Sequence, residues 1–298
     1  MSLYIGRFAP SPTGPLHAGS LATALASWVD AKHHQGSWLL RIEDIDPDRE
    51  ESGATQRIID TLDAHGLYWD IDVSYQSRQS RHYDLALAKL RTQNRLFACH
   101  CTRKHLRSVT TTEQPAYPGY CRGKALPEGD RALRVKVDDG NICFTDLLVG
   151  PQTENLTQTT GDFIVRRRGP LYAYQLAVVV DDAHQSITHI VRGADLLDNT
   201  ARQIALQRIL DYPTPKYLHL PTVQGDDGRK LSKQTGAQAL DNRAALDNLR
   251  VAWHFLGQNP VSARSPQEFL QRAITQWERS RIPSPNNQGC TTNQPLNC

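Results

Sequence analysis

Two stretches that lie far apart in the chain carry the residue types that hold phosphate groups. The first, RFAPSPTGPLHAGS, runs from Arg7 to Ser20, and the second, KLSKQ, runs from Lys230 to Gln234. The first follows a short apolar run and precedes a helical-looking segment, an order typical of strand, loop and helix. Such a loop presents backbone N–H groups and the positive end of a helix to one point, where phosphate is favoured. We expect the side chains of His17 and Ser20 to add donors there.

The second stretch places Lys230 and Lys233 three residues apart, just after the turn-forming residues 225–228. Mobile cations on a loop suit a pyrophosphate leaving group, whose charge grows as the bond to the α-phosphate breaks. Either stretch alone is weak, because an ordinary loop and solvated lysines would explain it. Together, and in this order, they predict a site for ATP.

Three cysteines form a second group of residues with a chemistry of their own. Cys99, Cys101 and Cys121 crowd together in a chain without an export signal, which favours metal ligation over disulfides. Spacing alone leaves the fourth ligand open among His100, His105, Tyr117 and Tyr120. Cys143 lies in an apolar-alternating segment, NICFTDLLVG, and is expected to be a small core residue.

Alternating strands and helices must position the first of these groups. We expect strands at residues 3–5 and Ser37–Ile42, and helices near 21–29, 51–65 and 81–93, which indicates a parallel sheet covered on both faces. Ligands of such sheets bind at the carboxyl ends of the strands, where the Arg7 loop and Glu43 fall.

The pattern changes to short segments with Pro, Gly and Cys from about residue 98. It resumes with a strand at Asp162–Arg166, a helix in YAYQLAVVVDDA, a strand in ITHIVRGADLL and a helix at 199–210. Residues 237–256 and 266–279 look helical, and the polar, Pro/Asn-rich end reads as disordered. We therefore divide the chain into an α/β domain with a lysine loop (1–97 and 147–236), a metal-binding insertion (98–146), a helical C-terminal subdomain (237–280) and a disordered tail (281–298).

Bulk properties narrow the function only slightly. A chain of 298 residues can bury a substantial core, and its net charge of +3 is too small to argue for nucleic acid by itself. No apolar run reaches membrane-spanning length and the N-terminus lacks the features of a signal peptide, so we expect a cytoplasmic protein.

The motifs carry a family resemblance. PSPTGPLHAGS and KLSKQ resemble the two signatures of class I aminoacyl-tRNA synthetases of the glutamyl type, and the likeness extends to RIEDIDPDR, DFIVRRRGPLYAYQLAVVVDD and HIVRGADLL. It spans about residues 3–240 and implies an α/β fold, a Rossmann-like catalytic domain with a small zinc-containing insertion and a short helical C-terminal part. Ser20 and Gln234 depart from the signatures, which carry a histidine and a serine there, and the reaction rate could be affected.

Few residues follow the lysine motif, about sixty, so we expect no large anticodon-binding domain. The short form resembles the glutamyl-Q tRNA(Asp) synthetases, truncated relatives that activate glutamate and attach it to the queuosine base of a tRNA anticodon. The resemblance implies a monomeric ligase that forms glutamyl-adenylate without tRNA and then modifies tRNA(Asp). Open alternatives are a small glutamyl-tRNA synthetase that charges a 3′ end, a nucleotidyltransferase and a non-catalytic tRNA-binding paralogue.

The resemblance also assigns roles to single residues. Arg7 would bind the side-chain carboxylate of glutamate and Glu43 its α-ammonium group, in a site made of Arg7, Phe8, Ala9, Pro10, Ser11, Glu43, Tyr174 and Arg192. ATP, accompanied by Mg²⁺, would contact His17, Gly19, Ser20 and Lys233, with His17, Lys230 and Lys233 as catalytic residues. One structural Zn²⁺ would be held by Cys99, Cys101, Tyr117 and Cys121.

From residue type alone, some of these positions could equally have a purely structural role. Arg7 would pass as a surface arginine, Glu43 as one member of a solvated acidic run and Tyr174 as a core aromatic residue. Three consecutive arginines, Arg166 to Arg168, suit either a tRNA phosphate or a basic turn on a solvated edge.

Overall fold

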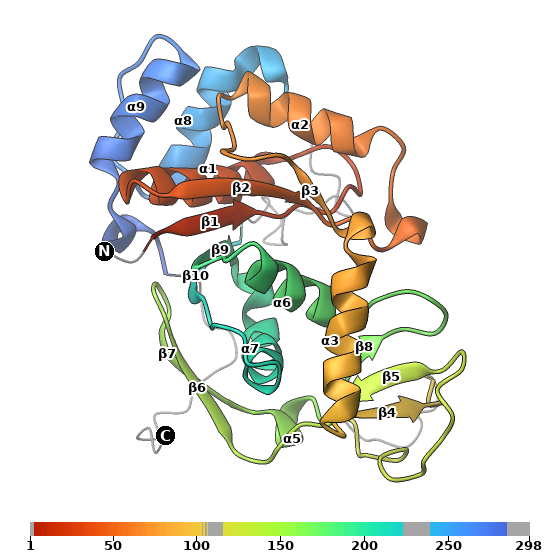
Figure 1. The fold of residues 1–298 in the computed structure, drawn as a ribbon. Helices are drawn as coiled ribbons and strands as arrows, with labels where there is room; N and C mark the ends of the chain where they lie inside the picture. The colour runs from red at the N-terminus through yellow and green to blue at the C-terminus, as the bar shows by residue number, and fades with distance from the viewer. Residues whose placement is uncertain (1–2, 103, 105, 107–115, 223–238, 285–298) are drawn as a thin grey trace.

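The computed structural model describes residues 3–102, 104, 106, 116–222 and 239–284 (Figure 1). A five-stranded sheet lies at its centre, in the order β10-β9-β1-β2-β3, and every neighbouring pair is parallel. The expected parallel α/β fold is thereby confirmed. The strands are β1 (Ile5–Phe8), β2 (Ser37–Ile42), β3 (Ser74–Tyr75), β9 (His189–Gly193) and β10 (Lys216–Leu220).

The first strand begins and ends later than the sequence suggested. We placed it at residues 3–5 and put Arg7 in the following loop, but Arg7 pairs with Leu39, and Phe8 with Leu40, in the ladder between β1 and β2. The backbone of Arg7 is therefore fixed by the sheet, and the irregular loop begins only at Ala9.

Helices cover both faces of the sheet (Figure 1). One face carries α1 (Ala18–His33), α2 (Ala54–Ala64), α8 (Ala245–Phe255) and α9 (Pro266–Gln276), and the other carries α3 (Ser80–Thr92), α6 (Tyr174–His184) and α7 (Thr200–Ile209). Side chains of β2 alternate accordingly: Trp38 and Leu40 join the first core and Leu39 the second. None of the helices in the described ranges combines the length and apolar character needed to cross a bilayer.

The C-terminal helix expected over 237–256 is shorter than predicted. A 3₁₀ turn (Asn242–Ala244) comes first, in which Asp241 accepts a hydrogen bond from the Arg243 amide, and the α-helix starts only at Ala245. Residues 237 and 238 lie outside the described part of the chain.

A second, antiparallel sheet contains β4 (Leu96–Cys99), β5 (Ala132–Val135) and β8 (Phe163–Arg166). We expected the strand at 162–166 to resume the parallel sheet, but it pairs with β5, where the apolar side chains of both strands join one core. The predicted domain boundaries stay predictions.

Between β5 and β8 the chain forms a hairpin of β6 (Asn141–Asp146) and β7 (Gly150–Asn155), followed by the short helix α5 (Leu156–Thr159). Cys143 lies on β6 but is only half-buried, whereas its neighbour Ile142 is a core residue. The expectation of a core cysteine at this position was therefore wrong, because the hairpin exposes that face of β6.

Candidate functional site

A cavity of about 480 Å³ opens at the carboxyl ends of β1, β2 and β9. The carboxyl ends of parallel strands lie at one edge of a sheet, which is where such folds bind ligands. All of the expected glutamate-site residues except Pro10 line it, and the carbonyl oxygen of Pro10 accepts a hydrogen bond from the Glu43 amide 3.0 Å away. The full lining is Arg7, Phe8, Ala9, Ser11, Thr23, Glu43, Arg49, Tyr174, Val191, Arg192, Gly193 and Leu196.

A buried network of charges lies behind this cavity and includes two of its lining residues, Arg7 and Glu43. Asp182 of α6 lies 3.2 Å from Nε of Arg7 and 2.8 Å from Nη1 of Arg41, whose side chain is fully buried. Arg41 also lies 3.5 Å from Glu43 and 3.8 Å from Asp181. Because the Nε edge of Arg7 faces Asp182, the fork of its terminal nitrogens is the part that can meet a ligand.

The network holds three carboxylates against two guanidinium groups, and the pKa directions reflect this excess of negative charge. Burial raises the pKa of Glu43, and the attraction of Arg41 and Arg7 does not fully oppose it. The pKa of Asp181 is also raised, chiefly by burial. The pKa of Asp182 is lowered, because its contacts with both arginines outweigh burial. The cavity therefore presents a fixed cationic fork at Arg7 and surplus negative charge at Glu43.

Sequence reasoning missed Arg41, Asp181 and Asp182 as part of this site. One signal could have found the aspartates: two adjacent carboxylates end an otherwise apolar helical segment, AVVVDDA. Charges on the buried face of a helix need partners, and such partners here come from β1 and β2.

Arg192 lines the cavity, yet its guanidinium is hydrogen-bonded inside the protein along its whole edge. Nε donates to His219 at 2.9 Å, Nη1 to Gln203 at 2.8 Å and Nη2 to Thr200 at 2.8 Å. His219 in turn contacts Asp146 through Nδ1 at 2.7 Å. Since Nε2 of His219 accepts from Arg192, Nδ1 carries the proton, and burial lowers the pKa of this imidazole. Sequence reasoning missed these supporting residues, which come from separate elements.

Tyr174, the first residue of α6, also belongs to the cavity wall. Burial, with the nearby Glu43 carboxylate, raises the pKa of its phenol, so the hydroxyl stays neutral and can donate a hydrogen bond. The alternative reading of Tyr174 as a core aromatic residue is therefore incomplete, because the side chain packs on the core and reaches the cavity as well.

His17 and Ser20 form a reciprocal cap at the start of α1. Nδ1 of His17 accepts hydrogen bonds from the amides of Gly19 (3.1 Å) and Ser20 (3.3 Å), while Oγ of Ser20 accepts from the amide of His17 (3.0 Å). The amides that we expected to face phosphate are thus engaged by the imidazole in this structure. Nδ1 acts as an acceptor, so the proton of the neutral ring is on Nε2. The roles of these residues toward ATP stay predictions, and Lys230 and Lys233 lie outside the described residues.

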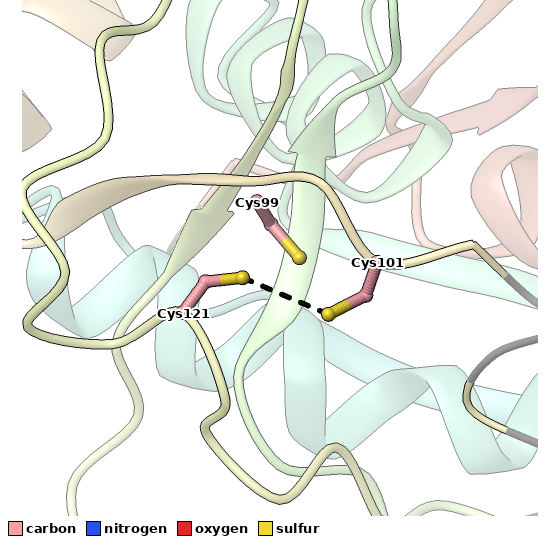
Figure 2. Close-up of side chains that lie close together, drawn as sticks. All are labelled: Cys99, Cys101 and Cys121. Carbon is pink, nitrogen blue, oxygen red and sulfur yellow. Dashed lines mark hydrogen bonds between the residues drawn. The ribbon is translucent and has the colours of Figure 1, made fainter.

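Three cysteine side chains converge at the end of β4 (Figure 2). The sulfurs of Cys99, Cys101 and Cys121 all lie within 4.8 Å of one another, and those of Cys101 and Cys121 are 3.6 Å apart. Tetrahedral coordination at about 2.3 Å requires sulfurs roughly 3.8 Å apart. The cluster could therefore hold a metal ion without rearrangement of the backbone.

Tyr117 is the oxygen donor that the fold brings to this cluster. Its hydroxyl lies 3.5 Å from Sγ of Cys99 and 4.0 Å from Sγ of Cys101, and accepts a hydrogen bond from the Cys121 amide. Of the alternatives, Tyr120 is 40% exposed, and His100 is exposed but has Nδ1 only 3.7 Å from Sγ of Cys121. His105 lies outside the described residues.

Arg134 of β5 contacts both a cysteine and the tyrosine of the cluster. Its Nε lies 3.3 Å from Sγ of Cys99 and its guanidinium stacks 3.8 Å from the centre of the Tyr117 ring. Burial of Cys99 disfavours the thiolate, but the contacts with Tyr117 and Arg134 outweigh burial and lower its pKa to about 7. A thiol that ionises this readily is suited to metal ligation.

A larger cavity, of about 810 Å³, adjoins the first and shares four residues with it: Ser11, Glu43, Arg49 and Tyr174. Its far wall consists of residues that follow β8 and of Cys101 from the metal cluster. The two cavities are thus neighbours, and their combined lining extends from the sheet edge to the antiparallel sheet.

Comparisons with known proteins agree with this arrangement. The catalytic domain of class I tRNA synthetases (E and Q) matches residues 5–281. The glutamyl-Q tRNA(Asp) synthetase of Cupriavidus metallidurans is 54% identical over 293 residues, covering 93% of this chain and 92% of that protein. That of Verminephrobacter eiseniae is 49% identical over 286 residues, covering 93% and 97%.

Among solved structures, the glutamate-tRNA synthetase of Elizabethkingia anophelis superimposes with a TM-score of 0.79 at 24% identity, over 94% of this chain and 67% of that one. This likeness establishes the fold. The extent of the match to the catalytic domain and the high identity over nearly full length establish the family: this chain belongs to the class I tRNA synthetases (E and Q), among the glutamyl-Q tRNA(Asp) synthetases.

Proposed function

We propose that this chain is a ligase that converts L-glutamate and ATP into glutamyl-adenylate without tRNA and then transfers the glutamate to queuosine in the anticodon of tRNA(Asp). The names of relatives that are 45–54% identical support this proposal. The observation that carries it is the pairing of a buried cationic fork, Arg7, with an excess of carboxylates at Glu43 in one cavity of amino-acid size.

Glutamate fits this cavity because its charges match. Its side-chain carboxylate would bind the terminal nitrogens of Arg7, which Asp182 holds in place through Nε, and its α-ammonium group would balance Glu43. Arg192 would add positive charge from a fixed position. The α-carboxylate is then the group left to face ATP at the start of α1.

In the first step an oxygen of the α-carboxylate attacks the α-phosphorus of ATP, and pyrophosphate leaves with the bonding electrons. His17 would donate from Nε2 to the phosphates, and Lys230 and Lys233 would stabilise the charge that grows on pyrophosphate. Mg²⁺ would be held mainly by phosphate and water. In the second step a nucleophilic oxygen of the acceptor nucleoside attacks the mixed anhydride, loses its proton and displaces AMP.

Zinc is the metal that best suits the cysteine cluster. Three thiolates and the phenolate oxygen of Tyr117 would complete a tetrahedral site without an open position, which is the arrangement of a structural ion. Metal analysis of the purified protein should find about one Zn²⁺ per chain, and Cys121→Ser should lower both the zinc content and the melting temperature. A zinc content unchanged by Cys121→Ser would contradict this assignment.

Pyrophosphate exchange tests the first half-reaction. Exchange should require glutamate, proceed without tRNA, and fall by a factor of about 100 or more in Lys233→Ala. Exchange that depends on glutamine, or that needs no amino acid, would overturn the proposal and point to another substrate or to a nucleotidyltransferase.

The acceptor is tested with labelled glutamate. Label should still be incorporated into tRNA whose 3′-terminal adenosine has been removed, and should be absent from tRNA without queuosine. Label that requires an intact 3′ terminus would show instead a small glutamyl-tRNA synthetase.

A further inference from the structure

Resting on the proposed function, we propose that the larger cavity receives the anticodon-loop segment of the acceptor RNA, with backbone phosphate on Arg167 and Arg168, and that phosphate displaces Asp46 from Arg167. This assigns a role to two of the three consecutive arginines whose role the sequence left open.

The fold separates the three arginines. Arg167 and Arg168 are exposed and line the larger cavity, whereas Arg166 is the last residue of β8, is half-buried and donates to the carbonyl oxygen of Gly129. Two hydrogen bonds anchor the turn that carries Arg167 and Arg168. The Arg167 amide donates to the carbonyl oxygen of Leu171, and Nη2 of Arg168 donates to the carbonyl oxygen of His100. Two cations are therefore held in the wall of the larger cavity, which Glu43 also lines.

Arg167 forms an ion pair with a carboxylate, Asp46, that also lines the larger cavity. Its Nη1 lies 3.0 Å from Oδ2 of Asp46, which also accepts from Nε of Arg49 at 2.8 Å. All three side chains line the larger cavity. Burial opposes ionisation of Asp46, but its contacts with Arg49 and Arg167 outweigh burial and lower the pKa of its carboxyl. A phosphate oxygen has the charge and geometry to take the place of this half-buried carboxylate on Arg167.

The remaining lining suits a splayed nucleoside. The ring of Tyr172 is held by a hydrogen bond from its hydroxyl to Asp84 and by contact with Tyr83, 4.8 Å between ring centres. Gln76 and Gln175 add amide groups. Single-stranded RNA is recognised by aromatic faces and polar groups of this kind, and a volume near 810 Å³ is large enough for one modified nucleoside. Because Ser11 and Glu43 border both cavities, a nucleoside here would lie beside the activated glutamate.

The decisive comparison is between the two partners of the ion pair. Arg167→Ala should weaken binding of queuosine-containing tRNA(Asp) about tenfold and lower the slope of log K against log salt by about 0.7. Asp46→Asn, which frees Arg167, should leave binding unchanged or tighten it. If the ion pair were only structural, both variants would weaken binding and lower the melting temperature together, and the inference would fail.

Two further measurements separate this inference from the proposed function. Arg168→Ala should reduce transfer from isolated glutamyl-adenylate more than it reduces pyrophosphate exchange, while Arg272→Ala, which removes a distant exposed cation on α9, should change neither. Failure of the wild-type protein to exchange pyrophosphate with glutamate would contradict the proposed function itself. Normal exchange and transfer in both Arg167→Ala and Arg168→Ala would refute only the RNA surface.

Discussion

At the scale of single residues, Glu43 combines a proposed role in binding glutamate with a burial that disfavours its charged form. Its side chain is 9% exposed, it lies 3.5 Å from the Arg41 guanidinium, and burial raises its pKa. The network around it contains one carboxylate more than it contains guanidinium groups. The α-ammonium group of the substrate would supply the missing positive charge. Without substrate, the network keeps one carboxylate that has no cationic partner of its own.

We therefore expect Glu43→Gln to lose activity and gain stability. Removing the partner of a buried ammonium should raise the KM for glutamate in pyrophosphate exchange by at least about thirtyfold. With a folded pKa above the unfolded value near 4.5, Glu43 contributes stability that is present below that value and lost as pH rises through the folded pKa. The variant should thus melt higher than the wild type at neutral pH, and a lower melting temperature would contradict this account.

The sequence identified residues that line this cavity but not the residues that hold them in place. Arg7, Ser11, Glu43, Tyr174 and Arg192 were predictable because family motifs mark them, and the structure brings them to one cavity. Their supports, Arg41, Asp182 and His219, were not predictable. The contacts of Asp182 join β1 and β2 to α6 across more than a hundred residues of chain, and that of His219 joins β10 to β9 across 27 residues, so no local pattern encodes them.

At the scale of elements, the segment after α5 holds the tyrosine of the metal cluster. Gly161 bridges to Tyr117, whose amide donates to the Thr160 carbonyl at 2.8 Å. A Cβ on Gly161 would lie 2.3 Å from the Tyr117 carbonyl oxygen and 2.7 Å from its nitrogen, in a backbone with φ +66°. Because both clashing atoms belong to the backbone of Tyr117, a side chain at position 161 would displace the Tyr117 segment.

Gly161→Ala should consequently lower metal affinity as well as stability. Gly150 offers a matched control, since it also has a positive φ, +84°, but no atom within 4 Å of the added Cβ. Both variants should lose about 1 kcal/mol from backbone strain, and only Gly161→Ala should lose zinc to a chelator at least severalfold faster. Equal zinc retention by the two variants would show that Tyr117 does not depend on this contact.

The first residue of β9, His189, is a histidine with a shifted pKa. His189 stacks on Tyr4 of the segment before β1, 3.9 Å between ring centres. Burial, together with the nearby Arg279, lowers its pKa to about 4. Its contribution to stability is full above the unfolded pKa of 6.5 and is lost as pH falls toward 4.

His189→Gln should therefore flatten the pH dependence of unfolding between pH 6.5 and 4. Allowing for solvent screening at this half-buried site, we expect the wild type to lose about 1 to 2 kcal/mol more than the variant over that range, measured by urea unfolding. Parallel pH profiles for the two proteins would place the acid sensitivity elsewhere.

Element identity was more predictable than element pairing. Most of the expected helices and strands lie within a few residues of their predicted positions because apolar periodicity and turn residues mark them, whereas the helix expected from residue 237 begins only at Ala245. The partner of β8 was wrong because a strand of four residues shows the same pattern in a parallel and in an antiparallel sheet.

At the scale of the whole molecule, one carboxylate joins the two ends of the described chain. Asp30 of α1 is fully buried and accepts from Tyr4 before β1, from Nε1 of Trp277 at 2.8 Å and from Arg279 at 2.7 and 2.9 Å. The C-terminal helices are thereby fixed to the face of the sheet that carries α1, whose start borders the proposed ATP site (Figure 1). Burial opposes ionisation of Asp30, but Arg279 and the other donors outweigh it and lower its pKa.

Asp30→Ala should be among the most destabilising single changes in this protein, because it leaves a buried indole N–H and a half-buried guanidinium without their acceptor. We expect a loss of about 3 to 5 kcal/mol in the free energy of unfolding. Adding Arg279→Leu should recover part of that loss, since it removes the uncompensated charge. Because the pKa of Asp30 is lowered, the wild-type advantage over Asp30→Asn should be full above pH 3.8 and shrink as pH falls further. An advantage that persists unchanged at pH 2, or a double variant no more stable than Asp30→Ala alone, would mean that packing rather than charge joins the two ends.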